Sequence, residues 1–266
     1  MEITDHTAAL RREGELLASA AEATDLDTPI PTCPEWRMRD LVRHMGDVHR
    51  WAATHVAERR MLPIKKVEEI AGPVPDDADL LAWFREGHTN LLHTLETADP
   101  DVQCWTFLIA PSPLAFWARR QAHETGIHRA DGESPGGRIT AFDPVFAIDG
   151  IDELLLGFLS RSGEDLHTDS PRTLHLEATD APASWLVRVG PEAVHVSRGS
   201  GMGDCEVHGT ASDLHLLLWN RRGADGLDVQ GDASLLTHWR DTVQIRWSRA
   251  RNIPEPPAET SRPARS

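Results

Sequence analysis

The stretch WRMRDLVRHMGDVHRWAATHVAERR, residues 36–60, decides the fold class. Its apolar residues recur at helical spacing, which predicts an amphipathic helix with one apolar side. These residues are Leu41, Met45, Val48 and Ala52. Comparable patterns occupy residues 4–23, 78–98, a segment from the Ser112-Pro113 pair to 131, and 144–159. The first four helices, joined by short to moderate connections, predict an antiparallel bundle, and the fifth leads out of it.

The pattern changes near Arg172, where short runs that alternate or are rich in β-branched residues begin. Gly, Pro and Asp separate these runs, as is typical of antiparallel strands. The runs are RTLHLEAT, ASWLVRVG, EAVHVSRG, CEVHGT, LDVQG and VQIRWS, with the helical segments ASDLHLLLWNRR and DASLLTHWRD among them. This mixture predicts a small α+β domain. We expect a helical domain over residues 1–145, the α+β domain over 146–250, and a disordered tail rich in Pro and charge over 251–266.

The composition argues against several classes of function. Acidic residues number 42 against 27 basic ones, and the formal net charge of -15 would repel a nucleic-acid backbone. The N-terminus carries charges throughout, unlike a signal peptide, and no segment approaches the roughly 18 apolar residues of a spanning helix. We therefore expect a cytoplasmic protein with neither nucleic acid nor membrane as a partner. Cys33, Cys104 and Cys205 are too scattered for a disulfide framework or a CxxC metal clip, and we expect them to be reduced and structural.

The segment HETGIH, residues 123–128, resembles the HExxH motif of zinc proteases but holds one residue too many. Five positions along a helix turn its two histidines apart by roughly 140°. Glu124 and His128, in contrast, are four positions apart and share one helix face. A third metal ligand has to come from another helix, and residues 36–60 offer His44 and His49 near the apolar side. Periodicity alone leaves the choice between these two histidines open.

Two runs, CPEWRMRDLVRHMGDVHRWA (33–52) and RRQAHETGIHRAD (119–131), resemble the N-terminal domain of the mycothiol-dependent maleylpyruvate isomerase family, one of the DinB-like helical bundles. Residues 209–239 are similar to the C-terminal domain of that family, so the resemblance covers nearly the whole chain. It implies a DinB-like four-helix bundle followed by a small α+β domain that resembles sterol-carrier-like folds. It also implies metal ligands at His44, Glu124 and His128.

Two imidazoles and one carboxylate leave a coordination position open on a divalent metal, as in catalytic zinc sites, and such an ion makes a bound thiol nucleophilic at neutral pH. These donors suit Zn, Ni, Fe and Mn, and we expect Zn. The resemblance implies that the thiol is mycothiol, and that the activity is that of an isomerase or S-transferase on a small electrophilic substrate. It further implies a catalytic arginine after LHLLLWN, where Arg221 fits the family pattern and Arg222 lies one residue off. A guanidinium group matches a substrate carboxylate.

Two other functions remain open at this stage. The chain can instead be a non-enzymatic protein that binds metal or an apolar ligand, which a fourth protein ligand on the metal would favour. It can also be a metal-dependent hydrolase, which a general base such as Asp131 beside the metal would favour. We expect core packing for Trp36, Trp51 and Trp117, while Gly126 either allows close helix packing or marks a relaxed, inactive site. We expect a monomer or a small homo-oligomer.

Overall fold

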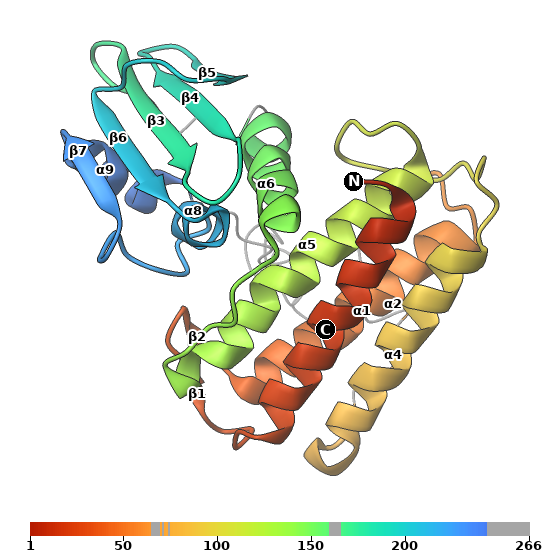
Figure 1. Ribbon diagram of the computed structural model, residues 1–266. Coiled ribbons are helices and arrows are strands. Elements are labelled where there is room, and N and C mark those ends of the chain that lie inside the picture. Colours follow the sequence, from red (N-terminus) through yellow and green to blue (C-terminus); the bar gives the residue numbers. More distant parts are fainter. Residues whose placement is uncertain (65–69, 71, 74, 160–165, 244–266) are drawn as a thin grey trace, which may run out of the picture.

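The computed structural model describes residues 1–64, 70, 72–73, 75–159 and 166–243. Its N-terminal half is a bundle of long helices that lie side by side (Figure 1). They are α1 (Ile3–Glu22), α2 (Met38–Ala57), α4 (Asp77–Thr97) and α5 (Pro113–Glu133). The helical bundle predicted from the sequence is thereby confirmed.

Helix α5 is the most deeply buried helix of the bundle. It begins where the sequence predicts, because Ser112 caps it by accepting a hydrogen bond from the backbone N–H of Ala115 at 3.1 Å, with Pro113 in the first turn. Its residues are buried without interruption from Arg120 to Gly132, since α1 and α2 cover one side and the second half of the chain covers the other. Every charged side chain in that segment therefore needs a partner inside the protein.

The start of the second helix differs from the sequence prediction. Helix α2 begins at Met38, and Trp36 instead lies in strand β2 (Cys33–Arg37), which pairs antiparallel with β1 (Pro29–Ile30). The carboxylate of Asp40 accepts a hydrogen bond from the backbone N–H of Arg37 at 2.9 Å and so closes the helix start two residues after Trp36. The consequence is a short hairpin at one end of the bundle, next to the last turns of α5 (Figure 1).

A fifth helical segment leads from the bundle into the second half of the chain, as expected. It consists of α6 (Pro144–Asp152) and a π-helical stretch, η2 (Glu153–Phe158). Asp143 caps α6 by accepting from the backbone N–H of Val145 at 2.9 Å. The expected domain boundary at residue 145 falls in the first turn of α6.

The second half is an α+β domain with a five-stranded mixed sheet of order β5-β4-β3-β6-β7, which confirms the predicted class. Strands β3 and β6 pair parallel and the other neighbours antiparallel. The elements are β3 (Arg172–Ala178), β4 (Ser184–Val189), β5 (Val194–Arg198), β6 (Cys205–Gly209), α8 (Ala211–Leu218), β7 (Asp228–Gly231) and α9 (Ser234–Thr242). The further strand expected at VQIRWS and the tail expected over 251–266 lie outside the described residues.

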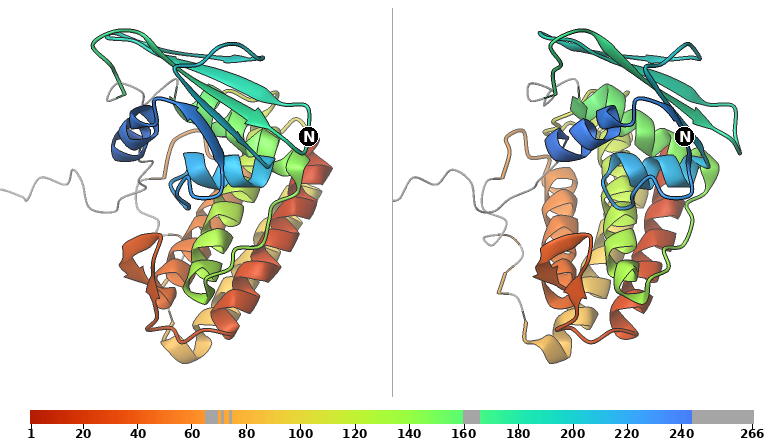
Figure 2. Two further views of the ribbon diagram at one scale, coloured as in Figure 1. Left: turned by 60° about the vertical axis from the view of Figure 1, so that its left-hand side comes forward. Right: turned by 90° about the vertical axis from the view of Figure 1, so that its left-hand side faces the viewer.

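Helices α6, α8 and α9 lie between the sheet and the bundle (Figure 2). One hydrophobic cluster continues from Trp117 of the bundle through Phe146 of α6 to Trp185 of the sheet. The two halves therefore share a core, which makes the packing of the α+β domain a determinant of the environment of α5.

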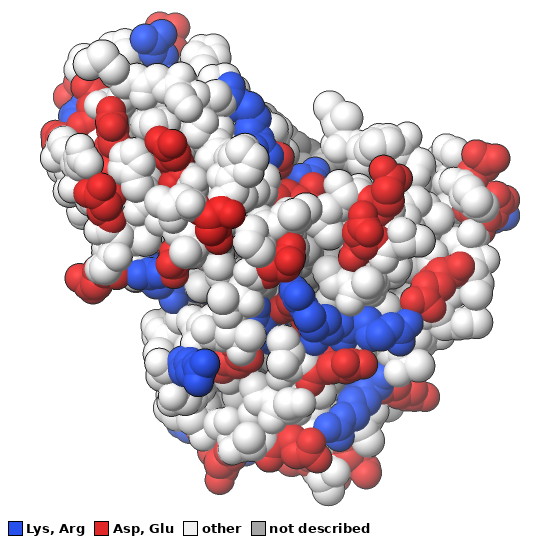
Figure 3. Space-filling view, viewed as in Figure 1, with Lys and Arg blue, Asp and Glu red and all other residues white. Residues whose placement is uncertain are grey.

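The outer face of α1 and α4 is strongly charged. Acidic and basic side chains lie interspersed on the face shown in Figure 3, and exposed ion pairs join the two helices: Arg11 to Glu96 at 2.6 Å and Arg85 to Glu22 at 2.8 Å. None of the helices in the described residues combines the length and the apolar character needed to cross a bilayer.

Candidate metal centre

The three metal ligands implied by the sequence come together between α2 and α5. His44 Nε2 lies 3.6 Å from Glu124 Oε1, and His128 Nε2 lies 3.4 Å from the same oxygen. All three candidate ligand atoms lie within 4.8 Å of one another. Glu124 and His128 meet because four residues make about one turn of α5, whereas His44 reaches them only because α2 packs along that helix.

The spacing of these atoms fits a metal ion. Bonds of roughly 2.0–2.2 Å at tetrahedral angles separate neighbouring ligand atoms by about 3.4 Å. The two distances to Glu124 Oε1 match this value and are longer than ordinary hydrogen bonds of about 2.7–3.2 Å. The donor set of two imidazoles and a carboxylate therefore suits a divalent cation.

The second oxygen of Glu124 is already engaged. Oε2 accepts a hydrogen bond from Arg120 Nη2 at 2.7 Å, and Arg120 also pairs with Glu153 at the start of η2. Burial alone would raise the pKa of Glu124, but the charge of Arg120 and the neighbouring His128 outweigh it, and the pKa lies well below its usual range. Glu124 is thus a carboxylate with one oxygen, Oε1, turned to the ligand point.

The other ring nitrogen of His128 has a carboxylate partner. Nδ1 donates to Asp131 Oδ2 at 2.9 Å, which leaves Nε2 to face Glu124. Asp131 also accepts from Thr32 Oγ1 at 2.6 Å and from Arg221 Nε at 2.8 Å. Burial by itself would lower the pKa of His128, but its bonds to Asp131 and Glu124 raise it to about 9. Burial by itself would raise the pKa of Asp131, but the charge of Arg221 outweighs it and lowers that pKa far below its usual value.

Of the two arginines considered from the sequence, Arg221 is the one that reaches this region. Its Nε and Nη2 donate to the two oxygens of Asp131 at 2.8 and 3.0 Å, and its Nη1 donates to the carbonyl of Trp219 at 2.8 Å. Arg222 turns away and pairs with Asp213 at the start of α8. A substrate carboxylate would therefore have to compete with Asp131 for the guanidinium of Arg221.

Trp36 packs against the core cluster around Leu41 and Met45, as expected, but it also borders the site, which the sequence did not predict. Its indole stacks on the His128 ring, with centroids 5.7 Å apart and planes 19° apart, and lies 4.9 Å from the His44 ring. Trp51 and Trp117 pack in the core as expected. The hairpin before α2 brings the indole of Trp36 to the site, whereas the sequence pattern predicts Trp36 as the start of that helix.

His49 and Cys33 contact residues outside the ligand set. His49 lies buried on another face of α2 and forms a hydrogen bond with Thr125 Oγ1 at 2.9 Å, so the choice of His44 agrees with the geometry. Cys33 lies beside Arg221, but burial and the charge of Asp131 raise the pKa of its thiol to about 12. The thiol stays protonated, which agrees with the expected structural role.

A second cluster of potential ligands joins α1, α5 and α6. His6 Nε2 and His123 Nε2 donate to the same oxygen of Asp149 at 2.9 and 2.7 Å, and Arg119 Nε donates to it at 2.9 Å. These are hydrogen-bond distances, about 0.5 Å shorter than a shared metal ion requires, and the arginine already neutralises the carboxylate. We interpret this cluster as a set of hydrogen bonds and an ion pair that fixes α6 against the bundle.

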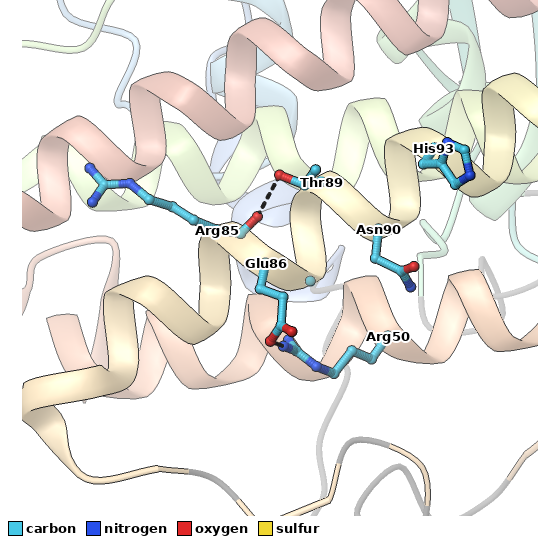
Figure 4. A pocket seen from close by; sticks show the side chains of 7 residues that line it. Arg50, Arg85, Glu86, Thr89, Asn90 and His93 are labelled. Carbon is cyan, nitrogen blue, oxygen red and sulfur yellow. Dashed lines mark hydrogen bonds and ion pairs between the residues drawn. The ribbon is translucent and has the colours of Figure 1, made fainter.

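A groove on the outer side of the bundle contains none of the predicted site residues. It has a volume of about 620 Å³ and is lined from α2 and α4, where Arg50 pairs with Glu86 at 3.1 Å (Figure 4). His93 and Asn90 line it as well. The candidate ligands lie between α2 and α5 and none of them lines this groove, so the groove is separate from the candidate centre.

Comparisons with known proteins agree with this architecture. Residues 7–132 match the mycothiol maleylpyruvate isomerase N-terminal domain, and residues 146–238 match the C-terminal domain of the same family. A search of the curated proteins found no match.

Among solved structures, the fold is similar to that of the mycothiol-dependent maleylpyruvate isomerase, with a TM-score of 0.58 at 12% identity over 86% of this chain and 93% of that chain. A histidine-to-alanine mutant of that isomerase matches over the same shares, with a TM-score of 0.59 and 12% identity. The two domain matches together span most of the sequence, and the chain therefore belongs to the mycothiol maleylpyruvate isomerase family.

Proposed function

We propose that this chain is a metal-dependent enzyme that uses mycothiol for isomerisation or S-transfer on a small electrophilic substrate. One observation carries the proposal: His44, Glu124 and His128 present three donor atoms at metal-ligand spacing. Membership of the family, and the likeness to an enzyme named as mycothiol-dependent, support the choice of thiol.

The residues of this chain would hold a divalent cation, for which we propose Zn²⁺, with one position left for a small molecule. Arg120 occupies the second oxygen of Glu124, so the carboxylate would bind through Oε1 alone. Asp131 holds His128 in the tautomer that presents Nε2. When bound, such an ion supplies a lowered pKa to a coordinated thiol, which makes the thiol a nucleophile at neutral pH.

Access to the site fits a small-molecule thiol. The side chain of His44 is 16% exposed, while those of Glu124 and His128 are 7% and 10% exposed, so the ligand point opens on the His44 side. The indole of Trp36 stacks on the imidazole of His128, lies beside that of His44 and forms one wall. A thiol entering there would meet an apolar surface beside the metal position.

Both rival functions receive less support. A hydrolase needs a base that faces the bound water, but Asp131 lies behind His128 and is paired with Arg221. A purely structural metal site needs a fourth protein ligand. In the described part of the chain, the ligand group around Glu124 contains three residues.

The first test is metal content. Protein purified without a His-tag or added metal should carry one Zn²⁺ per chain, and His44→Ala and His128→Ala should each lose it because two donors hold the ion weakly. His93→Ala is the matched control, since His93 is an exposed histidine on α4 that is not part of the candidate ligand group. Full retention of the ion by both ligand variants, with an unchanged circular dichroism spectrum, would overturn the proposal.

The second test addresses the reaction. Metal-loaded protein and mycothiol should either isomerise maleylpyruvate or conjugate mycothiol to members of a panel of small electrophiles. Both activities should vanish in His44→Ala and persist in His93→Ala. Metal-dependent turnover that is indifferent to mycothiol would instead favour the hydrolase.

A further inference from the structure

Each ligand that α5 contributes has an outer charged partner that leads into the second half of the chain. Glu124 is held by Arg120 at 2.7 Å, and Arg120 pairs with Glu153 of η2. His128 is held by Asp131 at 2.9 Å, and Asp131 pairs through both oxygens with Arg221, which follows α8. Two relays of alternating charge thus run from the candidate centre to the α+β domain.

Burial makes these relays strong. Arg120, Asp131 and Glu153 are 1%, 0% and 2% exposed, so their charges interact with little screening by water. The guanidinium of Arg120 also lies over the ring of Phe158, 5.1 Å from its centroid. Neither Arg120 nor Asp131 can turn away from its ligand without leaving a buried charge unpaired, which is strongly destabilising.

The two relays act on different properties of the ligands. The first neutralises one oxygen of Glu124 and fixes its rotamer, because Arg120 is itself held by Glu153. The second fixes the tautomer and the ring orientation of His128, because Asp131 is itself held by Arg221. Outer partners of this kind typically change metal affinity by about 10–100-fold.

We propose that Glu153 and Arg221 are positioning residues through which the α+β domain sets the metal affinity of the bundle. This inference rests on the metal site proposed above, and it reassigns Arg221 from binding a substrate carboxylate to holding Asp131. Because linkage is reciprocal, metal bound at the site should also stabilise the packing of η2 and the end of α8.

The test compares Glu153→Gln and Arg221→Gln with Arg222→Gln in the full-length protein. Arg222 is the matched control, because it neighbours Arg221 but pairs with Asp213 away from the ligands. Zn²⁺ affinity, measured by competition with a chromophoric chelator, should fall about 10–100-fold in the first two variants and stay within about twofold in the control. Arg221→Lys should restore part of the loss, since it returns the charge without the two-pronged contact.

Two further readouts separate positioning from general stability. The visible spectrum of the Co²⁺-loaded protein reports ligand geometry and should change in Arg221→Gln but not in Arg222→Gln. Hydrogen exchange in residues 153–158 and 211–221 should slow when Zn²⁺ binds to the wild type, and this protection should be smaller in both relay variants.

The experiment distinguishes a failure of the proposed metal site from a failure of the proposed positioning role. A wild-type protein that binds no Zn²⁺ refutes the metal site itself. A wild type that binds Zn²⁺, with Glu153→Gln and Arg221→Gln binding as tightly as Arg222→Gln, refutes the positioning role alone. Glu153→Gln keeps the size and one hydrogen-bond acceptor of the side chain, so it carries the test if Arg221→Gln fails to fold.

Discussion

The buried arginine that follows His128, the last of the proposed metal ligands, provides a quantitative test of how α1 and α5 are held together. Arg129 is fully buried; its Nε donates to Glu13 of α1 at 2.7 Å and its Nη1 donates to Glu133 at 2.8 Å. The guanidinium also lies 4.3 Å above the ring of Phe142. Arg129→Met keeps much of the side-chain volume but leaves the carboxylate of Glu13 buried with a weaker set of partners.

The expected loss of stability follows from that burial. Breaking a buried ion pair by removing one partner costs about 3–5 kcal/mol, because the remaining charge is uncompensated. Glu13 keeps Arg12 on its other oxygen at 2.6 Å, so we expect the lower end, about 3 kcal/mol. With a urea slope of about 3 kcal/mol per M, the unfolding midpoint should fall by about 1 M.

The assay is urea unfolding followed by far-ultraviolet circular dichroism. Arg85→Met is the control, because Arg85 forms an exposed pair with Glu22 and should lose at most about 1 kcal/mol. Adding Glu13→Gln to Arg129→Met removes the stranded charge, and the pair should show a coupling energy of about 1–3 kcal/mol. The reasoning is refuted if Arg129→Met shifts the midpoint no further than Arg85→Met, or if the two changes are additive.

Two further predictions concern acid stability and helix packing. Burial alone would raise the pKa of Asp149, but the hydrogen bond from His123 outweighs burial and lowers that pKa. The carboxylate therefore stabilises the fold above about pH 4, the pKa of Asp in the unfolded chain, and this contribution is lost progressively as the pH falls below that value. Thermal midpoints between pH 7 and 3 should therefore fall more steeply for wild type than for Asp149→Asn, and parallel curves would contradict this. Gly126→Ala places a methyl group 3.1 Å from Phe142, so crowding of about 1–3 kcal/mol should outweigh a helix gain of at most about 1 kcal/mol. A higher urea midpoint than wild type would show that the ring moves aside.

The crowding at Gly126 also bears on whether this glycine allows close helix packing or marks a relaxed, inactive site, which the sequence left open. A side chain at this position would meet Phe142 and Phe146, so the glycine allows α5 to pack closely against the start of α6. These contacts support the first interpretation, in which Gly126 allows close helix packing. The glycine therefore gives no reason to regard the site as relaxed.

The sequence by itself determined the long helices, the strands of the α+β domain and two of the three candidate ligands. Helical periodicity and the Ser112 cap are local properties, so the bundle and the start of α5 could be predicted within a few residues. Glu124 and His128 share a face because their separation matches the helical repeat. Adding His44 required the resemblance to a family, because residue spacing does not report how far one helix is rotated toward another.

Only the tertiary structure decided what surrounds those ligands. The partners of the relays are far apart in sequence: Asp131 and Arg221 are separated by 90 positions and Arg120 and Glu153 by 33. The hairpin that brings Trp36 beside the imidazoles could not be predicted either, because the sequence pattern of residues 36–60 predicts a helix that already includes Trp36. The physical reason is that a charge or ring acquires its role from the neighbours that packing assigns to it, and packing depends on helix rotation, crossing and burial rather than on local periodicity.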